Sequence, residues 1–157
     1  MTARTPPPLE RMLTYRLHQL HKLTDLQSQR AYLDATGLTL SDARCLTTIG
    51  SFQPLSINRL AQMGNLNKGQ ASRAAQFLVD QGWVRKSDSP DDGRGVVLTL
   101  TDAGQALFDQ TMAVVAQRNA DIFGCLSADE QRLLSQMFDR LIAHAQGAAP
   151  EQPTDPG

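Results

Sequence analysis

The sequence lacks any long apolar stretch. No run among its 157 residues approaches the roughly 20 consecutive apolar residues that a membrane-spanning helix needs. The N-terminal stretch MTARTPPPLERM has no apolar segment behind its arginine, which argues against a secretory signal peptide. With 41% hydrophobic and 20% charged residues the composition is that of an ordinary soluble domain. We therefore expect a cytoplasmic protein without a membrane partner.

Cysteine is scarce as well. Cys45 and Cys125 lie far apart and neither belongs to a CxxC motif, so we expect two reduced thiols. The sequence also has no nucleophile motif, no metal-ligand cluster and no phosphate loop, since LNKGQAS does not follow the G-x-x-x-x-G-K pattern. These absences argue against an enzyme and against a bound cofactor.

The charge of the chain is small but unevenly distributed. The net charge of −1 does not by itself suggest a nucleic-acid partner. Residues 1–100 nevertheless carry 12 Lys/Arg and 8 Asp/Glu, a balance of +4, whereas residues 101–157 carry 3 and 8, a balance of −5. Such asymmetry suits a protein that presents one face to a polyanion, although chance segregation of solvated charges explains it equally well.

Helical periodicity and capping residues predict helices over the first half of the chain. Leucines at spacings of three and four predict a helix from Leu9 to about Leu33. Three short helices follow, each opened by a residue type that commonly caps helices, and Gly50 is expected to end the first of them. The three predicted N-caps are Ser41, Ser56 and Asn67, and Gln70 completes a capping-box pattern with Asn67.

The pattern changes to strands and then returns to helices. Two β-prone runs, 83–87 and 96–100, flank the turn-forming segment DSPDDGRG, which predicts a β-hairpin. Beyond it a long helix is expected from Thr101 or Asp102 to about Phe123, and Ser127 is expected to cap another to about Ala145.

The predicted fold is mainly α with a small β-hairpin wing. Residues 37–101 form a winged helix-turn-helix lobe, flanked by N- and C-terminal dimerisation helices over 9–36 and 102–145. We expect these flanking helices to pair two chains as a homodimer, because one chain does not cover their apolar stripes. Residues 1–8 and the tail 146–157 are expected to be disordered, since they have almost nothing to bury.

The stretch NKGQASRAAQFLVDQG predicts a helix with two different sides. At about 100° per residue, three alanines and Leu78 fall on one side and polar residues on the other. The small side chains allow close packing behind a projecting polar face. Arginine pairs well with guanine, glutamine with adenine and serine with either, so this face can read DNA. An ordinary solvated face is the alternative. The candidate DNA contacts are Lys68, Gln70, Ser72, Arg73 and Gln76.

A further candidate contact lies at the tip of the predicted wing. Arg94 stands in the run DDGRG, and Asp92 can hold its guanidinium in one orientation. An arginine oriented in advance loses less entropy on entering a narrow minor groove. The simpler interpretation is an Asp/Gly turn that happens to contain an arginine.

These segments together resemble the MarR family of bacterial transcription regulators. The resemblance covers about residues 10–145 and is strongest over 37–104. Its most specific part is the wing signature, D-x-R followed by a strand ending in L-T-x-x-G. These residues are Asp92, Arg94, Leu100, Thr101 and Gly104. The resemblance implies a homodimeric repressor on double-stranded DNA, reading a pseudo-palindromic operator with the helix in the major groove and the wing arginine in the minor groove. Gly69-Gln70 replace the small hydroxyl residues common in the family, so the operator sequence is not implied.

The resemblance also implies a small aromatic, phenolic or carboxylate effector, bound between the dimer helices and the DNA-binding lobe. Candidate effector contacts are Tyr15, His18, His21 and Arg44, of which Arg44 can pair with a carboxylate. An internal salt bridge of Arg44 and solvated histidines are the simpler interpretations. The two histidines are three residues apart, but no third ligand is evident and no metal is expected.

The sequence leaves two other functions open. A winged-helix protein–protein interaction module would need an apolar patch on the exposed helix face, where Ser72 and Arg73 stand instead. A redox-responsive regulator would use Cys45 or Cys125, although the hydroperoxide-sensing relatives carry their cysteine near the N-terminus. Cys45 lies in an apolar stripe with Leu46 and is expected in the core.

Overall fold

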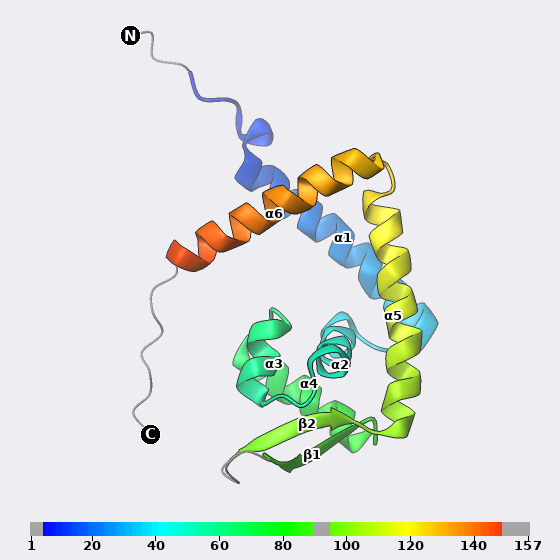
Figure 1. Ribbon diagram of the computed structural model, residues 1–157. Helices are drawn as coiled ribbons and strands as arrows, with labels where there is room; N and C mark the ends of the chain where they lie inside the picture. Colours follow the sequence, from blue (N-terminus) through cyan, green and yellow to red (C-terminus); the bar gives the residue numbers. More distant parts are fainter. Residues whose placement is uncertain (1–4, 90–94, 149–157) are drawn as a thin grey trace. The chain divides into compact units, whose positions relative to one another are not determined.

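A computed structural model describes residues 5–89 and 95–148. It contains a 3-10 turn, six helices and one two-stranded antiparallel sheet in these ranges, which confirms the predicted fold class (Figure 1). The elements are η1 (Leu9–Arg11), α1 (Leu13–Thr36), α2 (Leu40–Phe52), α3 (Ile57–Met63), α4 (Lys68–Asp80), β1 (Val84–Asp88), β2 (Val96–Leu100), α5 (Asp102–Phe123) and α6 (Ala128–Ala148). Residues 1–118 and 119–157 cluster as two compact units.

Three of the helices start as their capping residues predict. The Ser56 hydroxyl accepts a hydrogen bond from the first turn of α3. Asn67 and Gln70 form the predicted capping box, with the Asn67 side chain 2.8 Å from the Gln70 amide and the Gln70 side chain 3.1 Å from the Asn67 amide. Ser127 and Glu130 make the same reciprocal pair at the start of α6. Each pair satisfies two amides that the helix leaves unbonded.

The predicted limits of α2 are wrong at both ends. Thr39, not Ser41, is the N-cap, and its hydroxyl accepts a hydrogen bond from the Asp42 amide at 3.2 Å. Gly50 lies inside the helix, which continues to Phe52. The missing side chain of Gly50 has a packing role, because a Cβ there would overlap the ring of Phe108 from α5.

The outer helices also differ in detail from the prediction. The N-terminal helix opens with the 3-10 turn η1, and α1 then extends to Thr36 before Gly37 takes a left-handed conformation with φ 72°. The hairpin starts at Val84, one residue later than expected, and α6 ends at Ala148, three residues beyond the expected end. Residues 146–148 are therefore helical. The wing-tip residues Asp92 and Arg94 lie outside the described residues.

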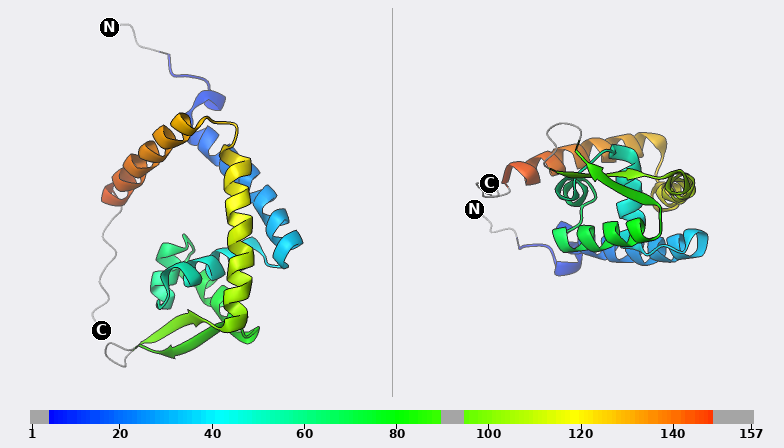
Figure 2. Two further views of the ribbon diagram at one scale, coloured as in Figure 1. Left: turned by 45° about the vertical axis from the view of Figure 1, so that its right-hand side comes forward. Right: turned by 90° about the horizontal axis from the view of Figure 1, so that it is seen from below.

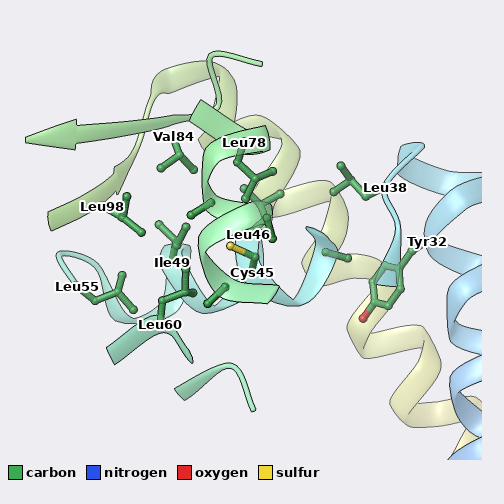
Figure 3. Packing of buried hydrophobic residues seen from close by; sticks show 14 residues of the cluster. Tyr32, Leu38, Cys45, Leu46, Ile49, Leu55, Leu60, Leu78, Val84 and Leu98 are labelled. Atoms are coloured by element: carbon green, nitrogen blue, oxygen red, sulfur yellow. The ribbon is translucent and has the colours of Figure 1, made fainter. Parts of the chain in front are cut away.

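The core of the first unit lies where α2, α3 and α4 meet the hairpin (Figure 3). Leucine and isoleucine side chains from every one of these elements except β1 are fully buried, and burial of each contributes about 1.5–3 kcal/mol. These residues are Leu46, Ile49, Leu60, Leu78 and Leu98. Tyr32 connects α1 to the same cluster. The core therefore holds α4 between the other helices and the base of the wing.

The hairpin is attached to the core along one face. β1 and β2 pair antiparallel, with Val84 opposite Leu100 and Asp88 opposite Val96. Val84 and Leu98 are buried, and the segment before α3 adds a further bridge to β2. In that bridge the Leu98 amide donates to the Leu55 carbonyl at 2.9 Å. The wing is thus anchored at its base on the helices.

Thr101 joins the hairpin to α5 without a loop (Figure 2). Its hydroxyl donates to the Gly82 carbonyl at 2.6 Å and accepts from the Gly104 amide at 3.1 Å, and its own amide donates to the Trp83 carbonyl at 3.0 Å. Gly104 packs directly on Trp83, because a Cβ at this position would overlap the Trp83 carbonyl oxygen. The T-x-x-G part of the wing signature is therefore a structural joint.

Large apolar side chains remain exposed on the outer helices. On α1 they include Leu13, Leu17 and Leu20. In the second unit, α6 exposes a stripe at spacings of four: Leu133, Met137, Phe138, Leu141 and Ile142. None of the helices in the described ranges combines the length and apolar character that crossing a membrane requires.

Candidate functional site

Helix α4 has the two sides that its sequence predicts. The side chains of Ala71, Ala74, Ala75 and Leu78 are at most 4% exposed, and the helix packs on α2 and α3 through them. The five predicted contact residues are all exposed: Lys68, Gln70, Ser72, Arg73 and Gln76. Small side chains on the buried side bring the helix close to its neighbours, so the polar side is held outward on a fixed support.

A tight turn places α4 relative to α3. The Gly64 amide donates to the Leu60 carbonyl at 2.8 Å and ends α3, and Asn65 then takes a left-handed conformation with φ 53°. Asparagine is one of the few residues besides glycine that adopts this conformation readily. The predicted helix-turn-helix connection through Met63-Gly64-Asn65 is thus present in the structure.

Two of the exposed polar side chains on α4 already have partners. Gln70 uses its carbonyl oxygen in the capping box. The Gln76 side chain accepts a hydrogen bond from Lys86 Nζ at 2.7 Å and donates one to Asp80 Oδ1 at 2.7 Å. A bidentate contact of either glutamine with adenine would first have to break one of these bonds.

Arg73 is an exposed polar side chain of α4 that is open to an external partner. In the described parts of the chain, neither it nor Ser72 makes a side-chain hydrogen bond or ion pair. Its guanidinium lies back over Gly69, where an added Cβ would come within 3.2 Å of Arg73 Nη1. Gly69 thus makes room for the arginine beside the first turn of α4.

The wing presents two basic side chains from β1. Arg85 and Lys86 are both exposed and, as neighbours on a strand, point to opposite faces. Lys86 faces α4, since it reaches Gln76. The pairing of Lys86 with Gln76 is missed by the sequence analysis, because it depends on how the hairpin folds back over the helix.

The structure brings together only two of the four candidate effector residues. An open hollow of about 350 Å³ is lined by residues from α1, α2, the end of α3 and the turn between α3 and α4. Its lining residues are His21, Arg44, Thr47, Thr48, Met63, Gly64 and Asn65. Tyr15 and His18 lie nearer the start of α1, are exposed and do not line this hollow.

Asp25, which is not a candidate in the sequence, is bonded to two residues that line this hollow. Its Oδ1 lies 2.9 Å from Arg44 Nη2, and its Oδ2 lies 3.2 Å from His21 Nε2. The alternative that Arg44 makes an internal salt bridge is therefore confirmed. His21 and Asp25 are four positions apart on a predicted helix, which is a recognisable pairing distance. Nothing local in the sequence points to Arg44 as the second partner.

The two cysteines lie in different surroundings. Cys45 is fully buried in the core, as expected, and this burial, reinforced by the negative charge of Asp42, raises the pKa of its thiol to about 12. It holds no useful thiolate fraction at neutral pH, which disfavours a role in redox sensing. Cys125 is exposed. No group of three His, Cys, Asp or Glu side chains within residues 5–89 and 95–148 is arranged to hold a metal ion.

The second unit contains a hollow that the sequence does not predict. It measures about 260 Å³ and is lined by three aromatic or aliphatic side chains and three polar ones. These residues are Asn119, Phe123, Gln131, Leu134, Ser135 and Phe138. Gln131 donates to the carbonyls of Phe123 and Leu126, at 3.1 and 3.0 Å, and so fixes the turn between α5 and α6.

Comparison with known proteins places the chain in a family. The sequence profile of the MarR family matches residues 36–95. The HTH-type transcriptional repressor Rv2887 of Mycobacterium tuberculosis is 32% identical over 111 residues, which are 71% of this chain and 80% of the repressor. The crystal structure of that protein with salicylic acid covers 90% of this chain and 99% of its own at 28% identity, with a TM-score of 0.67. A mutant of Escherichia coli MarR complexed with operator DNA covers 82% and 92%, at 25% identity and a TM-score of 0.71. The chain therefore belongs to the MarR family, whose members are transcriptional regulators.

Proposed function

We propose that the protein is a homodimeric, ligand-responsive repressor that binds a pseudo-palindromic DNA operator. The observation that carries this proposal is the outward polar side of α4, held on an alanine-lined back in a winged helix-turn-helix fold. The Escherichia coli relative was crystallised with operator DNA. The function needs no catalytic residue or cofactor and would be exercised in the cytoplasm.

The exposed residues of α4 would divide the work of recognition. Arg73 and Ser72 would contact base edges in the major groove, since their side chains have no other partner in the described structure. Lys68, at the helix N-terminus, would contact a phosphate together with the free backbone amides. Gln70 and Gln76 would join them at the cost of their present hydrogen bonds. Arg94, oriented by Asp92, would enter the minor groove.

The outer helices would pair two chains. The exposed stripe of α6 and the leucines of α1 give residues 9–36 and 102–145 the apolar surface that a homodimer buries. Residues 37–101 would then be the DNA-binding lobe of each subunit. A twofold pair sets a fixed distance between two copies of α4, which matches the symmetry of a pseudo-palindromic operator.

The hollow beside α1 is the proposed effector site. It reaches from His21 on α1, a proposed dimerisation helix, to the turn that precedes α4. A bound ligand would therefore touch both a dimerisation helix and the DNA-binding lobe. The Rv2887 relative was crystallised with salicylic acid, which supports a small aromatic, phenolic or carboxylate effector. Tyr15 and His18 would contribute from α1 in the dimer. A ligand that favours one spacing of the two DNA-binding lobes would release the operator.

Genomic footprinting with the purified protein tests this function. Sites with twofold symmetry are expected, and affinity measured on one such site by fluorescence anisotropy should fall steeply with added salt, because phosphate contacts release counterions. Binding without sequence preference, or an affinity insensitive to salt, would contradict the proposal and favour a protein–protein interaction module.

A further inference from the structure

The carboxylate of Asp25 is the centre of a three-residue cluster at the edge of the hollow beside α1. One oxygen pairs with Arg44 at 2.9 Å and the other with His21 at 3.2 Å. Each of the two side chains that could attract an anion into the hollow is thus already held by one and the same carboxylate. The inference drawn from this cluster rests on the proposed effector site.

The cluster is sheltered enough for its charges to matter. The Asp25 side chain is 28% exposed and that of Arg44 is 40% exposed, so water screens their interaction less than on an open surface. An anionic ligand that pairs with Arg44 must either displace Asp25 or sit beside it. The first choice breaks an existing ion pair, and the second places two negative charges close together.

The neutral groups of the hollow favour a different ligand. The Thr47 hydroxyl donates to the Ala43 carbonyl at 2.9 Å, and the Thr48 hydroxyl donates to the Arg44 carbonyl at 2.7 Å. Both hydroxyls have used their single hydrogen, so their oxygens offer only acceptors to a ligand. An uncharged ligand with O–H or N–H donors can bind these oxygens without disturbing Asp25.

We propose that Asp25 sets the charge preference of the hollow. As the counter-ion of Arg44 and the partner of His21, it makes the hollow favour uncharged hydrogen-bond donors, such as phenols and aromatic amides, over carboxylates of the same shape. Asp25 is therefore a specificity-determining residue. Replacing it with a neutral residue converts the hollow into a carboxylate site.

The test compares two probes of nearly equal shape, salicylate and salicylamide, by isothermal titration calorimetry of the full chain without DNA. The wild type should bind salicylamide at least as tightly as salicylate. Asp25→Asn should tighten salicylate about tenfold or more, the size typical of a freed charge-assisted hydrogen bond, while salicylamide changes less than about threefold. Asp34→Asn, an exposed position on the same helix, serves as the matched control and should change neither affinity.

Several outcomes would overturn the inference. They are a wild-type preference for salicylate, an Asp25→Asn variant whose salicylate affinity is unchanged or weaker, and a variant that binds neither probe. If Asp25→Asn does not fold, as judged by circular dichroism, Asp25→Ser takes its place with the same expectation. DNA binding is measured separately on the same samples. If the wild type does not bind an operator, the proposed repressor function is contradicted, whereas the measured ligand preference still decides the inference about Asp25.

Discussion

Lys86 of β1 donates a hydrogen bond to the side chain of Gln76 on α4 across 2.7 Å. Gln76 in turn donates to Asp80 one helical turn further along, also at 2.7 Å. The first strand of the wing and the exposed side of the helix are thereby connected on the surface as well as through the core. In the sequence Gln76 is a candidate base contact. In the structure its side chain lies between α4 and the wing and bonds to Lys86 of β1.

The link between Gln76 and Lys86 should be visible as energetic coupling in DNA binding. Gln76→Ala and Lys86→Met each remove one partner, so the double variant should weaken operator binding by less than the sum of the single effects, with a coupling of about 0.5–1 kcal/mol. Arg85→Met is the control, since Arg85 points to the other face of β1 and should be additive with Gln76→Ala. Additivity of Gln76 and Lys86 would show that the bond plays no part in binding.

Arg73 should determine sequence preference. Arg73→Ala should lower affinity for the best operator by about 1–3 kcal/mol and reduce discrimination at one base pair in each half-site, because a bidentate contact to a base is lost. Lys68→Ala should instead weaken binding to all DNA sequences alike. It should also lower the slope of log affinity against log salt concentration by about 1. Anisotropy titrations against a set of single-base operator variants distinguish the two. Equal loss on every sequence for Arg73→Ala would assign it to a phosphate.

Arg94 is expected to bind the minor groove from the tip of the wing. Arg94→Ala should weaken operator binding by about 1 kcal/mol or more, since a charge-assisted contact is removed, while the melting temperature stays unchanged. Gel-shift titration with thermal unfolding as a check measures both. Wild-type affinity in this variant would remove the wing tip from the recognition mechanism.

Replacing Gly104 should lower the free energy of unfolding. A Cβ at this position would overlap the Trp83 carbonyl, so Gly104→Ala must separate α5 from the base of the hairpin at a cost of about 1–3 kcal/mol. Gly147→Ala is the matched control, because no atom beyond its chain neighbours and the adjoining helix backbone lies within 4 Å of a Cβ built there. Urea denaturation measures both variants. A free energy of unfolding unchanged in Gly104→Ala would contradict the close contact.

The exposed stripe of α6 should hold the dimer together. Leu141 is 61% exposed in the single chain. Leu141→Glu should therefore leave a folded protomer but shift sedimentation from dimer to monomer, since a charge would be buried in the interface. Gln136→Glu adds the same charge to the same helix at an exposed polar position and should remain dimeric. A dimeric Leu141→Glu would place the interface elsewhere.

The sequence predicts α4 well because its signals are local. The capping box of Asn67 and Gln70 and the spacing of Ala71, Ala74 and Ala75 lie within one helix, and neither depends on distant residues. The two sides of the helix and the identity of its exposed residues follow directly.

Features that depend on distant residues are missed. Thr39 and Ser41 are both good caps, so residue type alone does not choose between them. The continuation of α2 through Gly50 goes with the packing of this glycine on Phe108 of α5. Asp25 reaches Arg44 across 19 positions, a distance that no periodicity encodes. For the same reason Gln76 reads as a base contact in the sequence, although the folded hairpin gives it a protein partner.

The short connection at Thr101 has a mechanical consequence for the hairpin and the start of α5. Thr101 is the single residue between β2 and α5. Its hydrogen bonds to Gly82, Trp83 and Gly104 hold the end of the strand and the start of the helix in a fixed position. β2 and the first turn of α5 therefore form one rigid structure. A change in the direction of the first turns of α5 would therefore be passed on to β2, because no loop lies between them to absorb it.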